Sequence, residues 1–157
     1  MQLNHPDIQE VLVTADQIQE RVAELATEIS EFYKDQDVLL LGILKGAVPF
    51  MADISRALSI PVQQDWMAVS SYGSGTVSSG VVRILKDLDA DIKDRHVLIV
   101  EDIIDSGLTL SWLTSNLKAR GAASVEIVTL LRKPEAAKVK IAVRWVGFDI
   151  PNAFVVG

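Results

Sequence analysis

Two continuous apolar runs constrain the fold of this chain most strongly, because each ends at a polar turn that a helix pattern follows. The first is VLLLGIL at 38–44, followed by a Lys-Gly turn and a predicted helix at about 49–58. The second is HVLIVED at 96–102, where the turn is Ser-Gly and the helix pattern runs to Gly121. Apolar strands that alternate with helices are typical of parallel sheets covered on both faces. The pattern therefore predicts an α/β fold, with a mostly parallel central sheet flanked by helices and joined by right-handed crossovers.

The remaining elements follow from periodicity. Thr14 and Gln17 fit a capping box, and apolar residues at alternating spacings of four and three predict a long amphipathic helix after them. The segment 73–80 is rich in glycine and serine, has almost nothing to bury, and should be mobile. Further strands are predicted at 60–72, 81–88, 124–131, 140–148 and 153–157. We expect one domain over residues 1–157, because a break in the Gly/Ser segment would leave two halves with few elements each.

Composition limits the partners and the location. The net charge of −6 disfavours broad nonspecific binding to nucleic acid or anionic lipid, although it does not forbid a small anionic ligand. The absence of cysteine excludes disulfides, thiolate metal sites and thiol nucleophiles, so an intracellular location is the default. No apolar run approaches the roughly 20 residues that cross a bilayer, and the first ten residues do not read as a signal peptide. We therefore expect no nucleic acid and no membrane among the partners.

The stretch VLIVEDIIDSGLTL, residues 97–110, places three carboxylates between an apolar run and a Ser-Gly turn. Ligands of open α/β sheets bind beyond the carboxyl ends of the strands, and Glu101 and Asp102 stand at such an end. Residues 105–109 add flexible backbone, two hydroxyls and the N–H groups of a new helix, which together can cradle a phosphate. Carboxylates beside a phosphate need a reason, because like charges repel.

Two roles for these acids suit a phosphate cradle. Neighbouring acids can hydrogen-bond the two hydroxyls of a ribose, or they can hold Mg²⁺ that neutralises phosphate oxygens, and both roles imply a sugar phosphate. Asp105 could instead face a reacting group as a base or hydrogen-bond acceptor. The plain alternative is that all three acids are only favourable charges at a helix N-terminus. The apolar pair Ile103-Ile104 weakens that alternative, because it buries the start of the loop and fixes the direction of the carboxylates.

This stretch closely resembles the phosphoribosyl pyrophosphate binding motif of type I phosphoribosyltransferases, and its EDIID form resembles the hypoxanthine-guanine branch. Four further segments agree in order. GILKGAVPF is similar to the family's pyrophosphate loop, VSSYGSGTVSSG to its mobile active-site loop, VTLLRK to its purine-contacting strand end and VGFDIPNAFVVG to its base-stacking segment. The resemblance begins at about residue 38. It implies the type I phosphoribosyltransferase fold with a small hood region, and purine salvage in the cytoplasm.

The resemblance also implies a role for each matching residue. Glu101 and Asp102 would bind the ribose hydroxyls, with Mg²⁺ held beside them. Asp105, the catalytic residue, would meet the five-membered ring of the purine and handle its proton. The 5′-phosphate would be held, mainly through backbone amides, by Ser106, Gly107, Leu108 and Thr109.

Other segments would hold the purine. Lys133 would contact the exocyclic oxygen at purine position 6, Phe154 would stack on the base, and the Val155 backbone would face the Watson–Crick edge. Each side chain has a plainer interpretation from its neighbours alone. Lys133 could be a solvated strand end, and Phe154 could be a core residue of the apolar run AFVV, although aromatic stacking is also how bases are ordinarily held.

Two loops would complete the site. Lys45 and Gly46 would bind pyrophosphate, and the peptide bond before this lysine is often cis in the family. Ser71 and Tyr72, with the Gly/Ser segment after them, would close over the reacting ribose and keep water out. The alternatives are a simple turn for the first loop and a disordered hairpin tip for the second.

The implied reaction transfers a 5-phosphoribosyl group from phosphoribosyl pyrophosphate to hypoxanthine or guanine, giving a nucleotide monophosphate and pyrophosphate. Family chains usually continue past VVG with a segment that bears an aspartate for a second Mg²⁺ and a basic residue near the pyrophosphate, so we expect that end of the family domain to be missing here. The family usually forms dimers or tetramers, so a homo-oligomer is expected.

Two other functions compete with this one. A regulatory module of the same fold could sense phosphoribosyl pyrophosphate while it grips RNA or DNA, but it would need a basic face or an added DNA-binding region. A phosphorelay receiver is suggested by LIVED, which resembles the acidic pair that ends a receiver's first strand. A receiver needs about four more βα units after that pair, more than the rest of the chain provides.

Overall fold

This computed structural model describes residues 5–72 and 81–157 of the chain. The described residues contain six strands, three α-helices and one short 3₁₀-helix, joined by loops. In chain order the elements are α1 (Ala15–Phe32), β1 (Val38–Ile43), α2 (Val48–Ala57), β2 (Val62–Tyr72), β3 (Val81–Lys86), β4 (His96–Ile104), α3 (Leu108–Ala119), β5 (Ser124–Arg132), the 3₁₀-helix η1 (Pro134–Ala136) and β6 (Trp145–Asp149). The segment 73–80, which was predicted to be mobile, lies outside the described residues.

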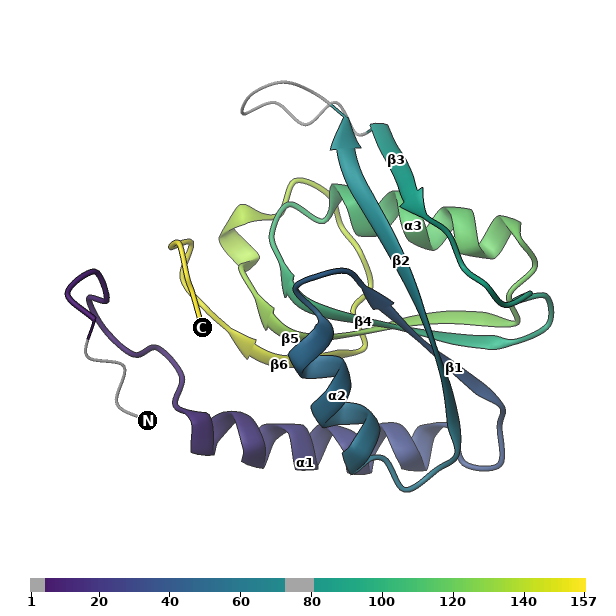
Figure 1. The fold of residues 1–157 in the computed structure, drawn as a ribbon, viewed down its shortest axis with the longest axis horizontal. Coiled ribbons are helices and arrows are strands. Elements are labelled where there is room, and N and C mark those ends of the chain that lie inside the picture. Colours follow the sequence, from purple (N-terminus) through teal and green to yellow (C-terminus); the bar gives the residue numbers. More distant parts are fainter. Residues whose placement is uncertain (1–4, 73–80) are drawn as a thin grey trace.

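The strands form a single sheet in the order β3-β2-β1-β4-β5-β6. Every neighbouring pair is parallel except β2 and β3, which pair antiparallel at the edge. The predicted α/β fold with a mostly parallel sheet is therefore confirmed. Figure 1 shows β2 and β3 reaching beyond the end of β1, where they form the small hood above the sheet.

The helices cover both faces of the sheet. Figure 1 shows α1 and α2 together on one face of the sheet. Residues of these helices such as Leu25 and Ile54 are buried there in one core cluster with Leu40 of β1. On the other face α3 buries Leu113 against Leu39 and its neighbours. Alternate residues of β1 thus enter opposite cores, and all six of its residues are buried. This explains why the strand reads as a continuous apolar run.

The helix termini follow the predicted signals. The Thr14 hydroxyl accepts a hydrogen bond from the backbone N–H of Gln17 at 3.2 Å, and the Gln17 side chain accepts one from the Thr14 N–H at 2.8 Å. This is the predicted capping box, and it satisfies two otherwise unpaired donors. Gly121, just past the end of α3, has a φ of +87°, a left-handed conformation that glycine adopts without strain.

Two predicted strands are corrected. The strand predicted at 140–148 begins only at Trp145, because Ile141 and Val143 pack as a loop against the core under α3. Their alternation mimics a strand, but it reflects a loop in which Ile141 and Val143 are partly buried and the residues after them are exposed. The strand predicted at 153–157 does not form, and the apolar side chains of Phe154 and Val156 are exposed. The apolar run at 153–157 therefore does not correspond to a buried strand.

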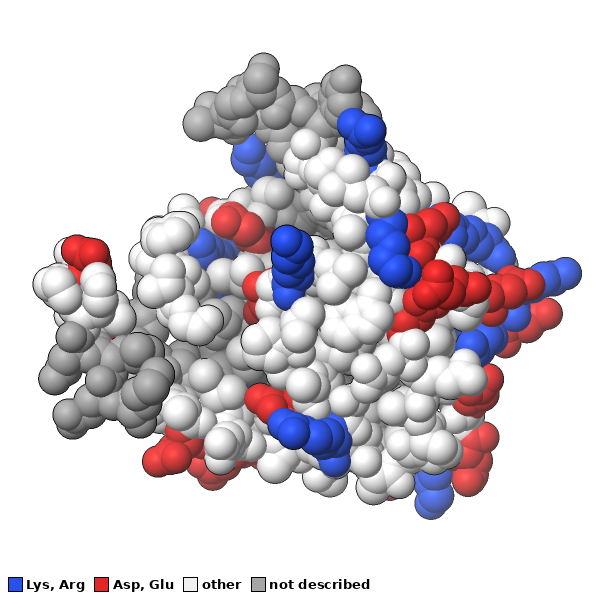
Figure 2. All heavy atoms as spheres, viewed as in Figure 1, with Lys and Arg blue, Asp and Glu red and all other residues white. Residues whose placement is uncertain are grey.

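The surface carries both signs of charge. On the face shown in Figure 2, basic and acidic side chains are interspersed over the described residues, without a continuous basic surface. Nonspecific nucleic-acid binding rests on such a basic surface. Within residues 5–72 and 81–157, no helix has the length and apolar character to span a membrane.

Candidate active site

Two acidic residues of the candidate site, Glu101 and Asp102, lie on the central strand β4 near its carboxyl end, and Asp105 follows the strand directly. β4 is flanked by β1 and β5, and the chain leaves β1 toward one edge of the sheet and β4 toward the other. The β1–β4 boundary is therefore the switch point at which ligands of such sheets bind. The Asp102 N–H donates to Glu101 Oε1 at 3.1 Å, and the Ile103 N–H donates to Asp102 Oδ1 at 2.8 Å. Each carboxylate is thus oriented by the backbone of the residue that follows it.

Burial and pairing perturb one of these acids strongly. Burial, followed by the side-chain hydrogen bond and the negative charge of Asp102, raises the pKa of Glu101 to about 9. A neighbouring cation would favour the ionised form of Glu101. Among the described residues, no group of three or more His, Cys, Asp or Glu side chains gathers to hold a metal. Two carboxylates nevertheless fit Mg²⁺, which is usually bound through one or two carboxylates, several waters and substrate phosphates.

The loop after β1 lies directly against this pair. A Cβ built on Gly46 would fall within overlap distance of the Asp102 carboxylate, 2.9 Å from its Cγ. The Leu44-Lys45 peptide bond is cis, as the resemblance implied, and the Lys45 side chain is exposed. The predicted pyrophosphate loop is therefore in contact with Asp102, one of the two predicted ribose-binding acids.

The start of α3 provides a phosphate cradle. Gly107 is its N-cap residue with a φ of +82°, and no side chain of the described residues caps this end. The first-turn N–H groups of the helix have no intrahelical acceptor, as is general at helix starts, and such a start can bind an anion. The Ser106 hydroxyl accepts from the Leu108 N–H at 3.4 Å, and the Ser106 carbonyl accepts from the Lys138 N–H at 2.9 Å. The loop over the α3 face therefore braces the cradle.

The hood touches the cradle from above. The hydroxyls of Ser71, near the end of β2, and Thr109, in the first turn of α3, are 3.5 Å apart. This contact brings the predicted ribose-covering segment to the predicted phosphate site. The Tyr72 side chain and residues 73–80 lie outside the part of the chain that the structure describes.

Asp105 and Lys133 meet on the other side of the site. Lys133 Nζ lies 3.7 Å from Asp105 Oδ2, and the Lys133 N–H donates to the Ile104 carbonyl at 3.0 Å. Lys133 is 8% exposed, so its interpretation as a solvated strand end is wrong. A buried ammonium needs a partner, and here the partner is the predicted catalytic carboxylate.

The segment after β6 presents its aromatic side chain to solvent. Phe154 is 93% exposed, so its interpretation as a core residue is wrong, and Val155 is half-buried. Among the described residues, no hydrogen bond or ion pair joins either residue to the other candidates. An exposed ring on an irregular segment is available for stacking on a planar ligand.

One polar pair near the site was not predicted. Arg132, the last residue of β5, forms a two-point ion pair with Asp149, the last residue of β6, at 2.6 and 3.0 Å. The pairing depends on the register of the two strands, which spacing in the sequence does not give. The one hint of this pair in the sequence is that Arg132 directly precedes Lys133, a predicted purine-binding residue.

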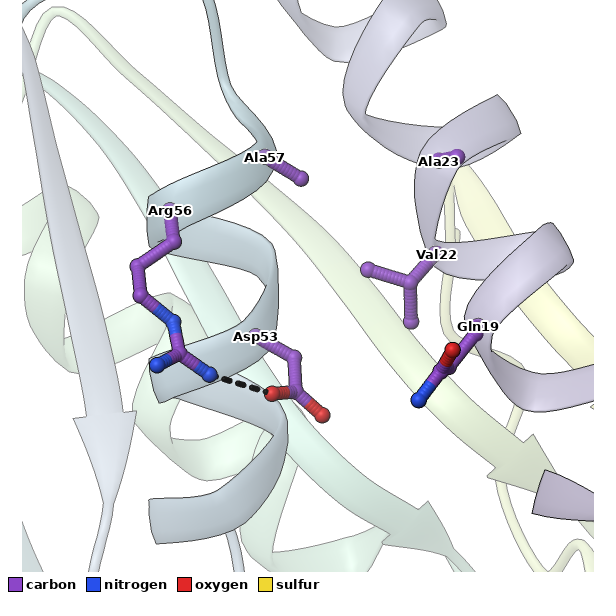
Figure 3. A pocket seen from close by; sticks show the side chains of 6 residues that line it. All are labelled: Gln19, Val22, Ala23, Asp53, Arg56 and Ala57. Carbon is purple, nitrogen blue, oxygen red and sulfur yellow. Dashed lines mark hydrogen bonds and ion pairs between the residues drawn. The ribbon is translucent and has the colours of Figure 1, made fainter. Parts of the chain in front are cut away.

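A hollow of about 300 Å³ lies elsewhere, between α1 and α2. Figure 3 shows the residues that line it, with Arg56 paired to Asp53 at 3.0 Å. None of its lining residues is a candidate site residue. The chemistry at the end of β4 is therefore separate from this hollow.

The comparisons with known proteins agree with this geometry. The family model of the phosphoribosyl transferase domain matches residues 12–157. A hypoxanthine-guanine phosphoribosyltransferase of Mycobacterium avium is 59% identical, over 96% of this chain and 77% of its own length. The chain belongs to the hypoxanthine-guanine phosphoribosyltransferase family. The member from Bacillus subtilis is 51% identical, over 96% of this chain and 84% of its own.

Solved structures of hypoxanthine-guanine phosphoribosyltransferases and related enzymes share the fold. A hypoxanthine phosphoribosyltransferase from Staphylococcus aureus superposes with a TM-score of 0.92 at 42% identity, over 94% of this chain and 80% of its own. The resemblance stated from the five sequence motifs is therefore confirmed, and with it the fold of these phosphoribosyltransferases.

Proposed function

We propose that this protein is a purine salvage enzyme. It transfers the 5-phosphoribosyl group of phosphoribosyl pyrophosphate to hypoxanthine or guanine, forming inosine or guanosine monophosphate and releasing pyrophosphate. The observation that carries the proposal is the contact of Asp102, the second residue of the acidic pair, with the loop at Gly46, on the strand that leads into the start of α3. That arrangement offers hydroxyl acceptors, a pyrophosphate loop and an anion site in one place.

The ribose and its phosphate occupy the end of β4 and the start of α3. Glu101 and Asp102 accept hydrogen bonds from the two ribose hydroxyls, because their carboxylates are already oriented by backbone N–H groups. The backbone amides of residues 106–109 hold the 5′-phosphate, since N–H groups at the start of a helix such as α3 have no intrahelical acceptor and favour an anion. Lys45 and Gly46 hold the pyrophosphate, with the exposed ammonium as a point charge.

Mg²⁺ is the proposed cofactor, held beside Glu101 and Asp102. When bound, it neutralises phosphate oxygens of phosphoribosyl pyrophosphate and of the departing pyrophosphate. The raised pKa of Glu101 supports this assignment, because positive charge next to this carboxyl would favour its ionised form. The chain itself orients the ribose and the phosphates, so positioning supplies much of the catalysis.

Asp105 and Lys133 act on the purine. Lys133 donates to the oxygen at purine position 6, and Asp105 accepts the proton of the five-membered ring. The 3.7 Å separation of Nζ and Oδ2 supports the pairing of these roles, because one purine ring system can reach both groups. Phe154 stacks on the base, and the backbone of Val155 faces its Watson–Crick edge.

The hood covers the reacting centre. Ser71 and Tyr72 close over the ribose and exclude water, which would otherwise hydrolyse a sugar with oxocarbenium character. The contact between Ser71 and Thr109 supports this role, because it already joins the hood to the phosphate cradle.

We also propose a homo-oligomer, a dimer or tetramer, of one domain per chain in the cytoplasm. Support for an oligomer comes from a Trypanosoma cruzi hypoxanthine phosphoribosyl transferase, 39% identical with a TM-score of 0.90, whose C-terminal region has been studied for its role in oligomeric state and activity. Size-exclusion chromatography with light scattering measures this directly.

The decisive experiment is a transfer assay. Purified protein with Mg²⁺, phosphoribosyl pyrophosphate and hypoxanthine should release pyrophosphate and form inosine monophosphate in equal amounts. Omission of the purine, or chelation of the metal, should stop the release. Pyrophosphate release that does not depend on the purine would refute the transfer and indicate simple hydrolysis.

A further inference from the structure

The two strands that carry the proposed purine-binding residues are joined at their last rung by an ion pair. Arg132 and Asp149 are register partners at the end of the β5–β6 ladder. Arg132 Nε donates to Asp149 Oδ1 at 2.6 Å, and Nη2 donates to Oδ2 at 3.0 Å. Such parallel two-point bonds fix the relative orientation of the two groups as well as their distance. Each partner shifts the other: the Asp149 carboxylate raises the pKa of Arg132, and the guanidinium lowers the pKa of Asp149.

Arg132 and Asp149 lie where the two segments that form the proposed purine subsite leave the sheet. The first segment begins at Lys133, and the second wall of the subsite is the segment 150–155. Lys133 follows Arg132 directly and turns inward to Asp105. Asp149 begins the segment that leads to Phe154 and Val155. The distance between the lysine and the stacking ring is therefore set where the two strands end.

Among the described residues, few other contacts hold the segment that follows β6. The Ile150 N–H donates to the Arg132 carbonyl at 2.8 Å, and the Ile150 side chain is buried. Residues 151–154, by contrast, are all exposed. Upstream, the Arg21 guanidinium of α1 donates to the carbonyls of Val146 and Gly147, which secures β6 before its end is reached. The last residue of this edge strand is held by its ladder and by Arg132.

We propose that Arg132 and Asp149 form a positioning pair, which sets the gap between Lys133 and the Phe154–Val155 segment and so governs purine affinity. The inference rests on the proposed function and adds two residues to it. Neither residue touches the reacting atoms in this assignment, because both act through their chain neighbours. Loss of the pair should therefore weaken binding of the purine and leave the phosphoribosyl pyrophosphate subsite, on β1, β4 and α3, unchanged.

The test compares Arg132→Met, Asp149→Leu and the double variant in the transfer assay. Each single variant should raise the KM for hypoxanthine about fivefold to tenfold, with kcat and the KM for phosphoribosyl pyrophosphate within about twofold of the wild type. Because the two residues act as one pair, the double variant should be no worse than either single variant. The Tm of each variant should stay close to that of the wild type, since half-exposed ion pairs contribute little to stability.

The same two strands offer a matched control. Arg144 lies just before β6 and pairs at 3.0 Å with Glu126, near the start of β5, while its guanidinium also stacks on Phe32. Arg144→Met removes a comparable ion pair at the opposite end of the strands. It should lower Tm more than Arg132→Met does and leave the KM for hypoxanthine unchanged.

The outcomes separate the two proposals. An unchanged KM for hypoxanthine in Arg132→Met, equal rises in both KM values, or the same rise in Arg144→Met would overturn the positioning role while the transferase function stands. Absence of purine-dependent transfer by the wild type would overturn the proposed function, and the pair's assignment would fall with it.

Discussion

The backbone of Gly46 lies against the carboxylate of Asp102, so close that a methyl group on this glycine would overlap Oδ2. The contact joins the loop after β1 to the end of β4. The φ of Gly46 lies outside the left-handed range that favours glycine, so other residues can adopt it. Glycine is therefore required here by space rather than by backbone conformation.

Gly46→Ala should weaken phosphoribosyl pyrophosphate binding. The added methyl displaces either the loop or the Asp102 carboxylate, and misplacement of binding groups is costly to catalysis. We expect the KM for phosphoribosyl pyrophosphate to rise at least about tenfold, with Tm lowered only slightly because the loop is exposed. Steady-state kinetics at saturating hypoxanthine provide the measurement. An unchanged KM would show that the contact is incidental.

Glu101 should make the ligand-free protein less stable as pH rises. Its pKa moves from an ordinary value of 4.5 to about 9 in the folded protein, so between these pH values the folded state keeps a proton that the unfolded state has lost. Stability is therefore highest below the unfolded pKa, and each unit of pH up to the folded pKa lowers the free energy of unfolding by up to about 1.4 kcal/mol.

Glu101→Gln isolates this effect. The variant lacks the ionisation, so the stability difference, variant minus wild type, should grow between pH 5 and pH 8 when no Mg²⁺ is present. Urea unfolding at several pH values measures it. A difference that stays constant over this range would contradict the raised pKa.

Asp105→Asn should separate chemistry from binding. If Asp105 handles the purine proton, an amide cannot replace it, and kcat should fall at least about 100-fold. The KM for phosphoribosyl pyrophosphate should change little, because Glu101, Asp102 and the start of α3 are untouched. A kcat near the wild-type value would exclude Asp105 as the base.

Phe154→Ala should reduce purine affinity without loss of stability. The ring is 93% exposed, so its removal leaves no cavity, whereas stacking on a base contributes about 0.5 to 1.5 kcal/mol beyond burial. We expect the KM for hypoxanthine to rise about tenfold with Tm unchanged. Val156→Ala is the matched control, because Val156 is also exposed, at 72%, and is assigned no contact with the base. Equal effects of the two variants would argue against stacking.

The strands and helices that carry the site could be predicted because each has a local cause. The capping box at Thr14 and the apolar run of β1 act within a few residues, and the structure confirms both. The segment 140–144 was misassigned, because its alternating apolar residues pack partly buried in a loop rather than pairing in a β-ladder. The alternation of apolar residues in a short segment indicates which side chains face the core, but it does not show whether the segment pairs with a strand.

The contacts within the site could not be read from the sequence in the same way. The closeness of Gly46 to Asp102 arises from the adjacency of β1 and β4, and that of Arg132 to Asp149 from the register of β5 and β6. Both depend on tertiary alignment of residues far apart in the chain. The motif resemblance named the individual residues, but only the folded sheet shows which of them touch.

The central claim is that the acidic end of β4 and the start of α3 bind a 5-phosphorylated ribose. A crystal structure of the complex with inosine monophosphate tests it most directly. The claim predicts the phosphate at the backbone amides of residues 106–109 and the two ribose hydroxyls at Glu101 and Asp102. A nucleotide bound anywhere else, with this end of the sheet occupied only by solvent, would contradict it.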